Sequence, residues 1–394
     1  MKIKKLAAVI AVLSTTAFVT MSLIKQPEKT SINTPQTNFN TTAKPTATPK
    51  IQAAILLDVS NSMDGLIEQA KAQLWNMVSV MGKAECNNAA PVLEIALYEY
   101  GRTSNDAKKG YVKQISGFTG DLDKLSQKLF DLKTYGGDEY CGHVIYSSVE
   151  ELNWDPSEKN YKVIFIAGNE DFLQGDVPYS RACSEAAKKG VIVNTIYCGD
   201  RLSGIKEHWN LTAECNGGSY TNINQNEKVI EIPTPYDSTI FALNGKLNNT
   251  YVFYGENGAS GYLAQESTDK QNYALSKTAA AKRVAVKGEK GLYKNDSWDL
   301  VDATEKDAEM INKIDLKTLP PALKNKSRKE VEVYVKSKNE ERKQIQKEIV
   351  SINNKREEFI KTEKQKTGKV SATLESEVEK IIRVQAKKYN MVIK

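Results

Sequence analysis

Short apolar runs alternate with helix-spaced apolar residues through roughly the first half of the chain that follows residue 50. The runs are typical of strands buried on both faces of a sheet, and they lie at Ile51–Leu57, Val92–Tyr98, Tyr111–Ser116, Val163–Ala167 and Val191–Tyr197. Helices are predicted between them, at Leu66–Met81, Leu122–Leu132, Val144–Leu152, Pro178–Lys189 and around Trp209 to Cys215. This alternation predicts an α/β domain over residues 51–228, with a Rossmann-like, doubly wound, mostly parallel sheet and helices on both faces.

Two further segments follow this domain. Residues 229–325 combine an aromatic stretch, a glycine-rich turn and an alanine-rich run, and they predict a small mixed segment. Residues 326–394 are highly charged, with apolar positions at heptad spacing that predict a coiled-coil-like helical tail, interrupted at Gly368. Two forms remain open: a helical hairpin that packs on itself or on the main domain, which we favour, and a coiled coil through which chains self-associate.

The N-terminus has the pattern of an export signal. A basic segment, Met1–Lys5, precedes an uncharged apolar run from Leu6 to Ile24. The run is nearly long enough to span a membrane and has no clean small-x-small cleavage site, so an anchor is favoured over a cleaved signal peptide for residues 1–25. Residues 26–50, rich in Thr and Pro, predict a disordered linker. We therefore expect an exported protein of the cell envelope, membrane-anchored through this segment or released to the periplasm or exterior.

Composition narrows the chemistry. The chain has 394 residues, a net charge of +6 and only two histidines, so triad or multi-histidine mechanisms are poorly supported. Its lysines and arginines are mixed with acids, as on solvated helices, and no nucleic-acid partner is expected. The five cysteines allow disulfides in an exported protein, and because five is odd, at least one cysteine is free or pairs between chains. Cys141 and Cys198 could form a redox pair or supply a thiol nucleophile, but a structural disulfide or buried thiols are the favoured interpretation.

A cluster of oxygen-bearing side chains follows the first predicted strand. Asp58, Ser60 and Ser62 come directly after it and before a helix. Ligands bind at this carboxyl edge in open parallel sheets, and carboxylate and hydroxyl oxygens suit a hard cation such as Mg²⁺. Helix capping would explain one such residue, but it does not explain three at alternating positions.

The segment Asp58-Val-Ser60-Asn-Ser62 resembles the Asp-x-Ser-x-Ser signature of the von Willebrand factor A (VWA) family, and the resemblance covers about residues 51–228. It implies a Rossmann-like domain with a metal-ion-dependent adhesion site. In that family a Thr of a second loop, and often an Asp of a third, complete the metal site. A carboxylate of the bound partner commonly supplies the last ligand.

The two later loops depart from the family pattern. Glu139 stands where the family has Thr, and Asp138 or Thr134 could serve as a ligand in its place. Gly168 aligns with the family's Asp, so Asn169 or Glu170 would have to reach the metal, or the third loop has lost its role. The expected metal ligands are therefore Asp58, Ser60, Ser62, Glu139 and Asn169, with Mg²⁺, or else Mn²⁺ or Ca²⁺, as the ion.

The departures resemble an exported bacterial subgroup of VWA proteins. The shared segments include Tyr98–Gly101, Gly136–Gly142, Phe165–Glu170 and Trp298–Asp302. This likeness extends over nearly the whole mature chain, and it implies an architecture and no particular partner.

The crowding of acids suggests both a cation and a kind of partner. Asp58, Asp138, Glu139, Glu170 and Asp171 would gather on one edge, where like charges raise each other's pKa unless a cation neutralises them. The surplus charge would also weaken the attraction for an incoming carboxylate, so the ligand could be neutral or basic. We expect a binding module for a protein or surface ligand, and not an enzyme. The alternatives are a metal-dependent hydrolase with a carboxylate as general base, and a structural envelope spacer assembled through its helical tail.

Overall fold

The structure, a computed structural model, describes residues 48–86, 89–226, 231–367 and 374–393. The expected signal or anchor, and nearly all of the expected linker, lie outside these ranges. Within them, no helix is both long enough and apolar enough to cross a membrane.

A six-stranded sheet forms the centre of the α/β domain. Its strands, in spatial order, are β4 (Lys113–Thr119), β3 (Val92–Tyr100), β1 (Lys50–Asp58), β5 (Tyr161–Gly168), β6 (Ile192–Cys198) and β7 (Tyr220–Ile223). Only β4 is antiparallel to its neighbour; the other pairs are parallel. The predicted fold class, a doubly wound and mostly parallel sheet, is confirmed. The short strand β7 was not predicted.

Strand β1 shows why the central strands are uniformly apolar. Its odd-numbered residues, such as Ile55 and Leu57, face one hydrophobic core, and Ala54 and Leu56 face another. Both faces of the sheet are therefore covered, which removes the apolar–polar alternation of a half-exposed strand.

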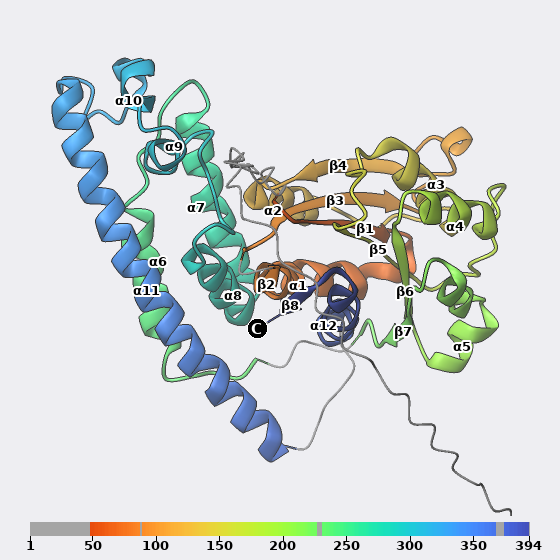
Figure 1. Cartoon of the computed structure of the whole chain (residues 1–394). Coiled ribbons are helices and arrows are strands. Elements are labelled where there is room, and N and C mark those ends of the chain that lie inside the picture. Colours follow the sequence, from red (N-terminus) through yellow and green to blue (C-terminus); the bar gives the residue numbers. More distant parts are fainter. Residues whose placement is uncertain (1–47, 87–88, 227–230, 368–373, 394) are drawn as a thin grey trace, which may run out of the picture. The chain divides into compact units, whose positions relative to one another are not determined.

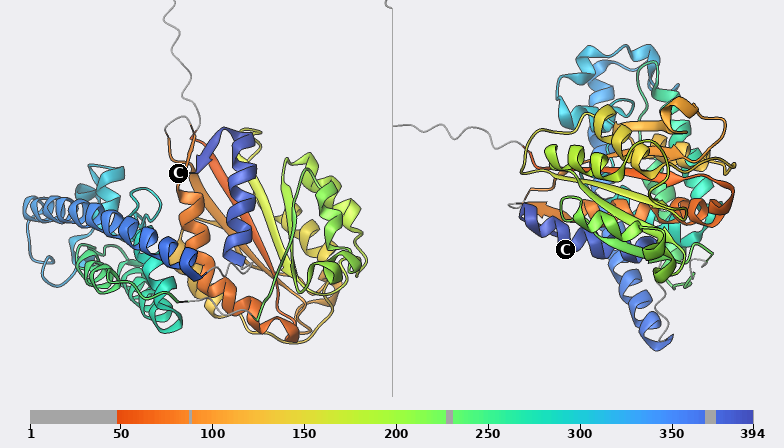
Figure 2. Two further views of the ribbon diagram at one scale, coloured as in Figure 1. Left: turned by 90° about the horizontal axis from the view of Figure 1, so that it is seen from below. Right: turned by 90° about the vertical axis from the view of Figure 1, so that its right-hand side faces the viewer.

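Helices cover the two faces of the sheet (Figures 1 and 2). One core is closed by α1 (Asp64–Gly82), α2 (Leu122–Phe130) and α12 (Leu374–Gln385). The other is closed by α3 (Cys141–Glu151) and α4 (Tyr179–Lys188). The short helix α5 (Arg201–Lys206) and the 3₁₀ turn η3 (Trp209–Glu214) lie between β6 and β7 along the chain.

The end of the chain returns to the sheet. Helix α12 packs beside α1 (Figure 2, dark blue beside orange), and Gln385 at its end joins a buried hydrogen-bond network. Its amide oxygen accepts from the Tyr161 hydroxyl at 2.8 Å, and its amide nitrogen donates to Asn194 at 2.7 Å. Beyond it, β8 (Met391–Ile393) pairs antiparallel with β2 (Ala84–Cys86). The α/β domain thus takes a covering helix from residues that the sequence assigned to the helical tail.

The segment predicted to be small and mixed is mainly helical. Its helices are α6 (Asp237–Asn248), α7 (Gly258–Leu275), α8 (Lys277–Gly288), α9 (Leu300–Lys306) and α10 (Met310–Lys313). An isolated bridge between Phe253 and Asp299 is the one β element described in it. Tyr251 stacks on Trp298 there, with ring centroids 5.7 Å apart, which accounts for the aromatic stretch seen in the sequence.

Helix α11 (Arg328–Thr367) carries the heptad seam (Figure 1). The seam is buried within the chain against α6, α8 and α9, and it includes Val331, Val335, Arg342, Ile345, Ile349 and Arg356. Arg342 donates to Asp299 and Asp302, both at 2.7 Å, which explains a charged residue at a seam position. This packing favours the intramolecular form over a coiled coil between chains.

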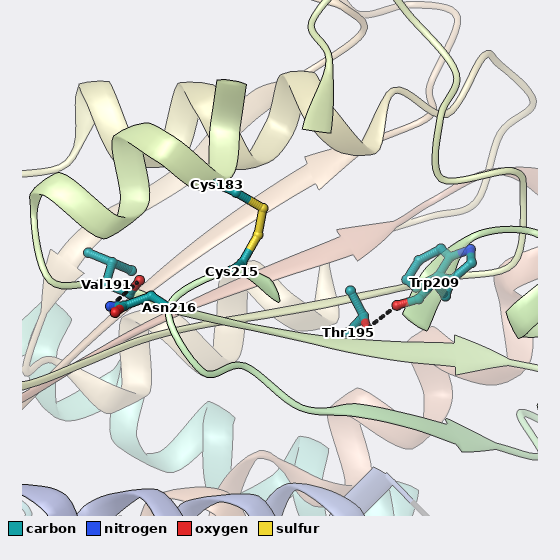
Figure 3. The surroundings of a disulfide bond; sticks show 6 residues. All are labelled: Cys183, Val191, Thr195, Trp209, Cys215 and Asn216. Atoms are coloured by element: carbon teal, nitrogen blue, oxygen red, sulfur yellow. Dashed lines mark hydrogen bonds between the residues drawn. A yellow bond between two sulfur atoms is a disulfide. The ribbon is translucent and has the colours of Figure 1, made fainter. Parts of the chain in front are cut away.

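One disulfide joins Cys183 of α4 to Cys215, just after η3 (Figure 3). The Cα atoms are 4.9 Å apart. Close by, the Thr195 hydroxyl of β6 donates to the carbonyl of Trp209 at 2.7 Å, so η3 is linked to β6 and the residue after it is linked to α4. Cys86, Cys141 and Cys198 are free, and no disulfide joins the last two.

Because α12 closes the core, truncating its buried side should unfold the α/β domain more easily. Ile382→Ala is expected to lower the free energy of unfolding by about 2–5 kcal/mol, since Ile382 is fully buried. Val384→Ala on the same helix is the control, because Val384 is 64% exposed, and we expect a change below about 0.5 kcal/mol. Urea unfolding followed by circular dichroism measures both. Equal effects would mean that α12 is not part of the cooperative core.

Candidate metal centre

The loop between β1 and α1 gathers the three side chains of the predicted motif. Asp58 is the last residue of β1, and its Oδ1 accepts the Ser60 amide at 2.8 Å. The hydroxyls of Ser60 and Ser62 lie 3.1 Å apart. Ser62 also donates to Oδ1 of Asn169, which follows β5, at 3.3 Å. Four of the five predicted ligands are therefore linked by direct contacts.

The Asp58 carboxylate is buried and incompletely partnered. Its second oxygen, Oδ2, accepts no hydrogen bond of normal geometry. Burial raises the pKa of Asp58 to about 7, although the backbone and hydroxyl of Ser60 and the backbone N–H of Asn169 lower it part of the way, and the charge of Glu170 raises it further. A buried anion in this position gains stability from a cation or from a proton.

Glu139 brings the second carboxylate. It lies in the loop before α3 and is almost fully buried, and burial raises its pKa to about 8. The charges of Asp58 and Glu170 add to this rise, and Ser60 hydrogen-bonds to Glu139 and opposes it. The electrostatic effect of Asp58 on Glu139, and the contact of Ser60 with both, mean that the two carboxyls lie side by side.

A glycine makes room for the two carboxylates. Gly101 has a φ of +80°, and a Cβ there would lie 2.9 Å from Asp58 Oδ1 and 3.0 Å from Glu139 Cγ. Both its backbone conformation and this close approach require glycine.

A second glycine explains the missing acid of the third loop. A Cβ on Gly168 would lie 2.5 Å from the Tyr100 hydroxyl and 3.1 Å from Asp58 Oδ2. The Tyr100 hydroxyl, which donates to the carbonyl of Ala167 at 3.0 Å, occupies the space that a side chain at position 168 would need. An aspartate could not be accommodated there without rearrangement.

The other residues weighed as ligands are placed differently. The Thr134 hydroxyl donates to Asp64 at the start of α1. Asp138 is exposed, with the Tyr140 hydroxyl 3.5 Å away. Asp171 contacts His208, with its Oδ1 2.9 Å from Nδ1. Glu170 is exposed and acts on Asp58 and Glu139 through its charge.

Sequence reasoning assigned no role to Tyr100, Gly101 or Trp209 at this site. The first two lie in the segment Tyr98–Gly101, whose glycine directly after a strand was the available signal. The Trp209 ring lies against the Gly168 position, 3.1 Å from where a Cβ would be, and its indole N–H donates to the carbonyl of Glu170 at 2.7 Å. Nothing in the local sequence points to this contact.

The donor set fits a hard divalent ion. Within the described ranges, no group of three or more His, Cys, Asp and Glu side chains is arranged to hold a metal. An ion at this edge would therefore rely on two carboxylates, two hydroxyls and one amide oxygen, with water completing the shell. Oxygen ligands of this kind, with retained water, are what Mg²⁺ prefers.

The thiols nearby are poorly suited to catalysis. Burial raises the pKa of the Cys141 and Cys198 thiols above its usual range, so the reactive thiolate is disfavoured. Cys141 lies 3.8 Å from the Tyr100 hydroxyl.

Comparison with known proteins gives likeness at the level of structure only. No family model matches the chain, and no curated protein matches it. The VWA domain of SpRpn10 is similar over 45% of this chain and 90% of its own, with 14% identity and a TM-score of 0.35. An aerotolerance-related membrane protein from Bacteroides fragilis is similar over 45% of this chain and 93% of its own, with 16% identity and a TM-score of 0.31. A von Willebrand factor type A structure from Catenulispora acidiphila is similar over 45% of this chain and 39% of its own, with 15% identity and a TM-score of 0.33.

The strand order β4-β3-β1-β5-β6-β7 and the helices on both faces of the sheet define the fold. A Rossmann-like domain of this kind is what the resemblance of the sequence to the VWA family implies.

Proposed function

We propose that this chain is a binding module of the cell envelope that holds a divalent cation, Mg²⁺ in the first place, at the carboxyl edge of its sheet. Asp58, Ser60, Ser62, Glu139 and Asn169 would hold the ion, which would supply positive charge at the surface where a protein or other ligand binds. The envelope location rests on the export pattern of residues 1–25.

One observation carries the proposal. Asp58 Oδ2 is buried without a hydrogen-bond partner, beside a second buried carboxylate. Two adjacent buried acids are unfavourable unless they share a proton or a cation. The hydroxyls of Ser60 and Ser62 and the Asn169 amide oxygen add neutral donors at the same place. Such a set suits the holding of a cation.

Calorimetric titration of the full chain with Mg²⁺, Mn²⁺ and Ca²⁺ tests this. Asp58→Ala should reduce metal affinity more than about 100-fold, and Glu139→Gln by at least about 10-fold. Asp138→Asn is the matched control: it removes a carboxylate from the same loop as Glu139, but an exposed one that acts through its charge alone, and it should lower metal affinity by less than about 3-fold. No heat with any of the three ions would refute the proposal. Loss of binding in Asp138→Asn, with Glu139→Gln normal, would exchange the roles of the two acids.

A further inference from the structure

The metal edge carries more negative charge than one divalent ion can neutralise. Its carboxylates are Asp58 and Glu139, which are buried, and Asp138 and Glu170, which are exposed. None of the four takes part in an ion pair with a lysine or arginine of the described chain. Arg102, the residue after Gly101, pairs with Glu99 at 3.2 Å.

The net charge of the metal edge determines whether it attracts a positively or a negatively charged ligand. Four carboxylates against the two positive charges of the ion leave the edge negative even when the ion is bound. An incoming carboxylate, phosphate or anionic lipid surface would meet repulsion, whereas lysine and arginine side chains would be attracted. Asp138 and Glu170 are exposed, so an arriving cationic group can reach them without entering the core.

Exposed apolar side chains lie in the same loops as these acids and on α5. Tyr135, Leu173, Leu202 and Ile205 are 63%, 45%, 77% and 41% exposed. The Tyr135 amide donates to the carbonyl of Val59 at 2.7 Å, which fixes this residue beside the β1–α1 loop. On the other side, the Phe172 amide donates to the carbonyl of Glu207 at 3.0 Å, which joins the loop of Leu173 to the end of α5. Exposed large apolar residues gathered around a polar site are typical of protein-binding surfaces.

We infer that the metal edge binds a protein segment in which lysine or arginine side chains stand between apolar ones. The basic groups would contact Asp138 and Glu170, and the apolar ones would cover Tyr135, Leu173 and Leu202. The inference rests on the proposed function and adds the chemistry of the partner.

Two labelled peptides of equal length and equal leucine content test it, one with lysine and one with glutamate at the polar positions. Fluorescence anisotropy would be measured with the full chain in Mg²⁺ and about 150 mM salt, where the Debye length is about 8 Å. We expect the lysine peptide to bind and the glutamate peptide not to. The double variant Asp138→Asn, Glu170→Gln should weaken the lysine peptide at least about 10-fold, and Leu202→Ser about 5-fold.

Matched control variants distinguish binding at the metal edge from nonspecific attraction of the peptide to any exposed acid or leucine. Glu256→Gln removes an exposed acid away from the sheet edge, and Leu263→Ser removes a leucine that is 62% exposed on α7. Both should leave peptide binding unchanged. Preference for the glutamate peptide, binding of neither peptide, or equal losses in the controls would overturn the inference. The metal titration keeps the two proposals apart: if the wild type binds metal but the peptide result fails, only the inference falls.

Discussion

Arg283→Ala is expected to lower the free energy of unfolding by about 3–5 kcal/mol, because it leaves buried carboxylates without their counter-charge. Arg283 lies on α8 and is only 1% exposed. Its guanidinium donates to Asp123 of α2 and to Asp269 of α7, and it lies over the Trp75 ring of α1 with 4.5 Å to the ring centroid. A single side chain thus connects the α/β domain to the helices that follow it.

The neighbours of Arg283 cannot replace it. Lys287 contacts Asp269 at 3.0 Å, and the hydroxyl of Tyr293 donates to Asp123. Burial opposes ionisation of Asp269, but Lys287 and Arg283 together hold its pKa below the usual range. The Lys287 ammonium is itself fully buried, and burial lowers its pKa to about 8. Without Arg283, Asp123 would retain only the neutral Tyr293 hydroxyl of these partners.

Urea unfolding at pH 7 measures the effect, with Arg181→Ala as the control. Arg181 also lies over an aromatic ring, that of Tyr146 at 4.7 Å, but it is exposed, so the expected loss is below about 1 kcal/mol. Arg283→Lys keeps the charge but not the forked geometry, and its loss should fall between the two. A loss below about 1 kcal/mol for Arg283→Ala would show that the buried cluster does not hold the two parts together.

The sheet was accessible from the sequence because its signals are local. A strand buried on both faces needs an unbroken apolar run, and β1, β3, β5 and β6 each have one at the expected place. The first turn of the site was accessible for the same reason, since Asp58, Ser60 and Ser62 lie within one loop.

What sequence reasoning could not find depends on contacts between distant segments. The hydrogen bonds of Gln385 to Tyr161 and Asn194 span 224 and 191 positions. No local pattern marks α12 as a covering helix of the sheet in preference to a tail helix, because either role needs the same apolar stripe. The charge network of Arg283 was missed for the same reason. In the sequence its residues look like ordinary solvated charges, and they are buried only because α7 and α8 pack against α1 and α2.

The site also has one part that the sequence could predict and one part that only the structure shows. Glu139 was chosen from its loop position, and it lies beside Asp58; its role as a metal ligand stays a prediction. The unpartnered Oδ2 and the space taken by the Tyr100 hydroxyl are properties of the assembled sheet edge, so only the structure could give them.

Without metal, the protein is expected to lose stability as the pH rises from about 5 to about 8. The folded-state pKa of Asp58 is raised to about 7 and that of Glu139 to about 8, whereas both would be near 4 in the unfolded chain. A carboxyl with a raised folded pKa stabilises the fold fully below its unfolded pKa, and this contribution is lost as the pH passes through the folded value. The loss from Asp58 alone is at most about 4 kcal/mol by pH 8.

A bound divalent cation should abolish this trend, because the cation displaces the protons and both carboxyls are then ionised in the folded as in the unfolded protein. Mg²⁺ affinity is then expected to rise through the same pH range, and binding at pH 6.5 to release protons, measurable by calorimetry in two buffers of different ionisation enthalpy. Urea unfolding between pH 5 and pH 9, in chelator and in Mg²⁺, gives the stability. Asp58→Asn is the decisive variant: it removes the buried charge, so the metal-free protein should be more stable than wild type at pH 8 and indifferent to Mg²⁺. The difference between wild type and Asp58→Asn also subtracts other groups that titrate here, such as Lys287. If the chelated wild type keeps constant or rising stability from pH 6 to pH 8 relative to Asp58→Asn, the Asp58 carboxyl is not held in an unfavourable site, and the case for a cation there fails.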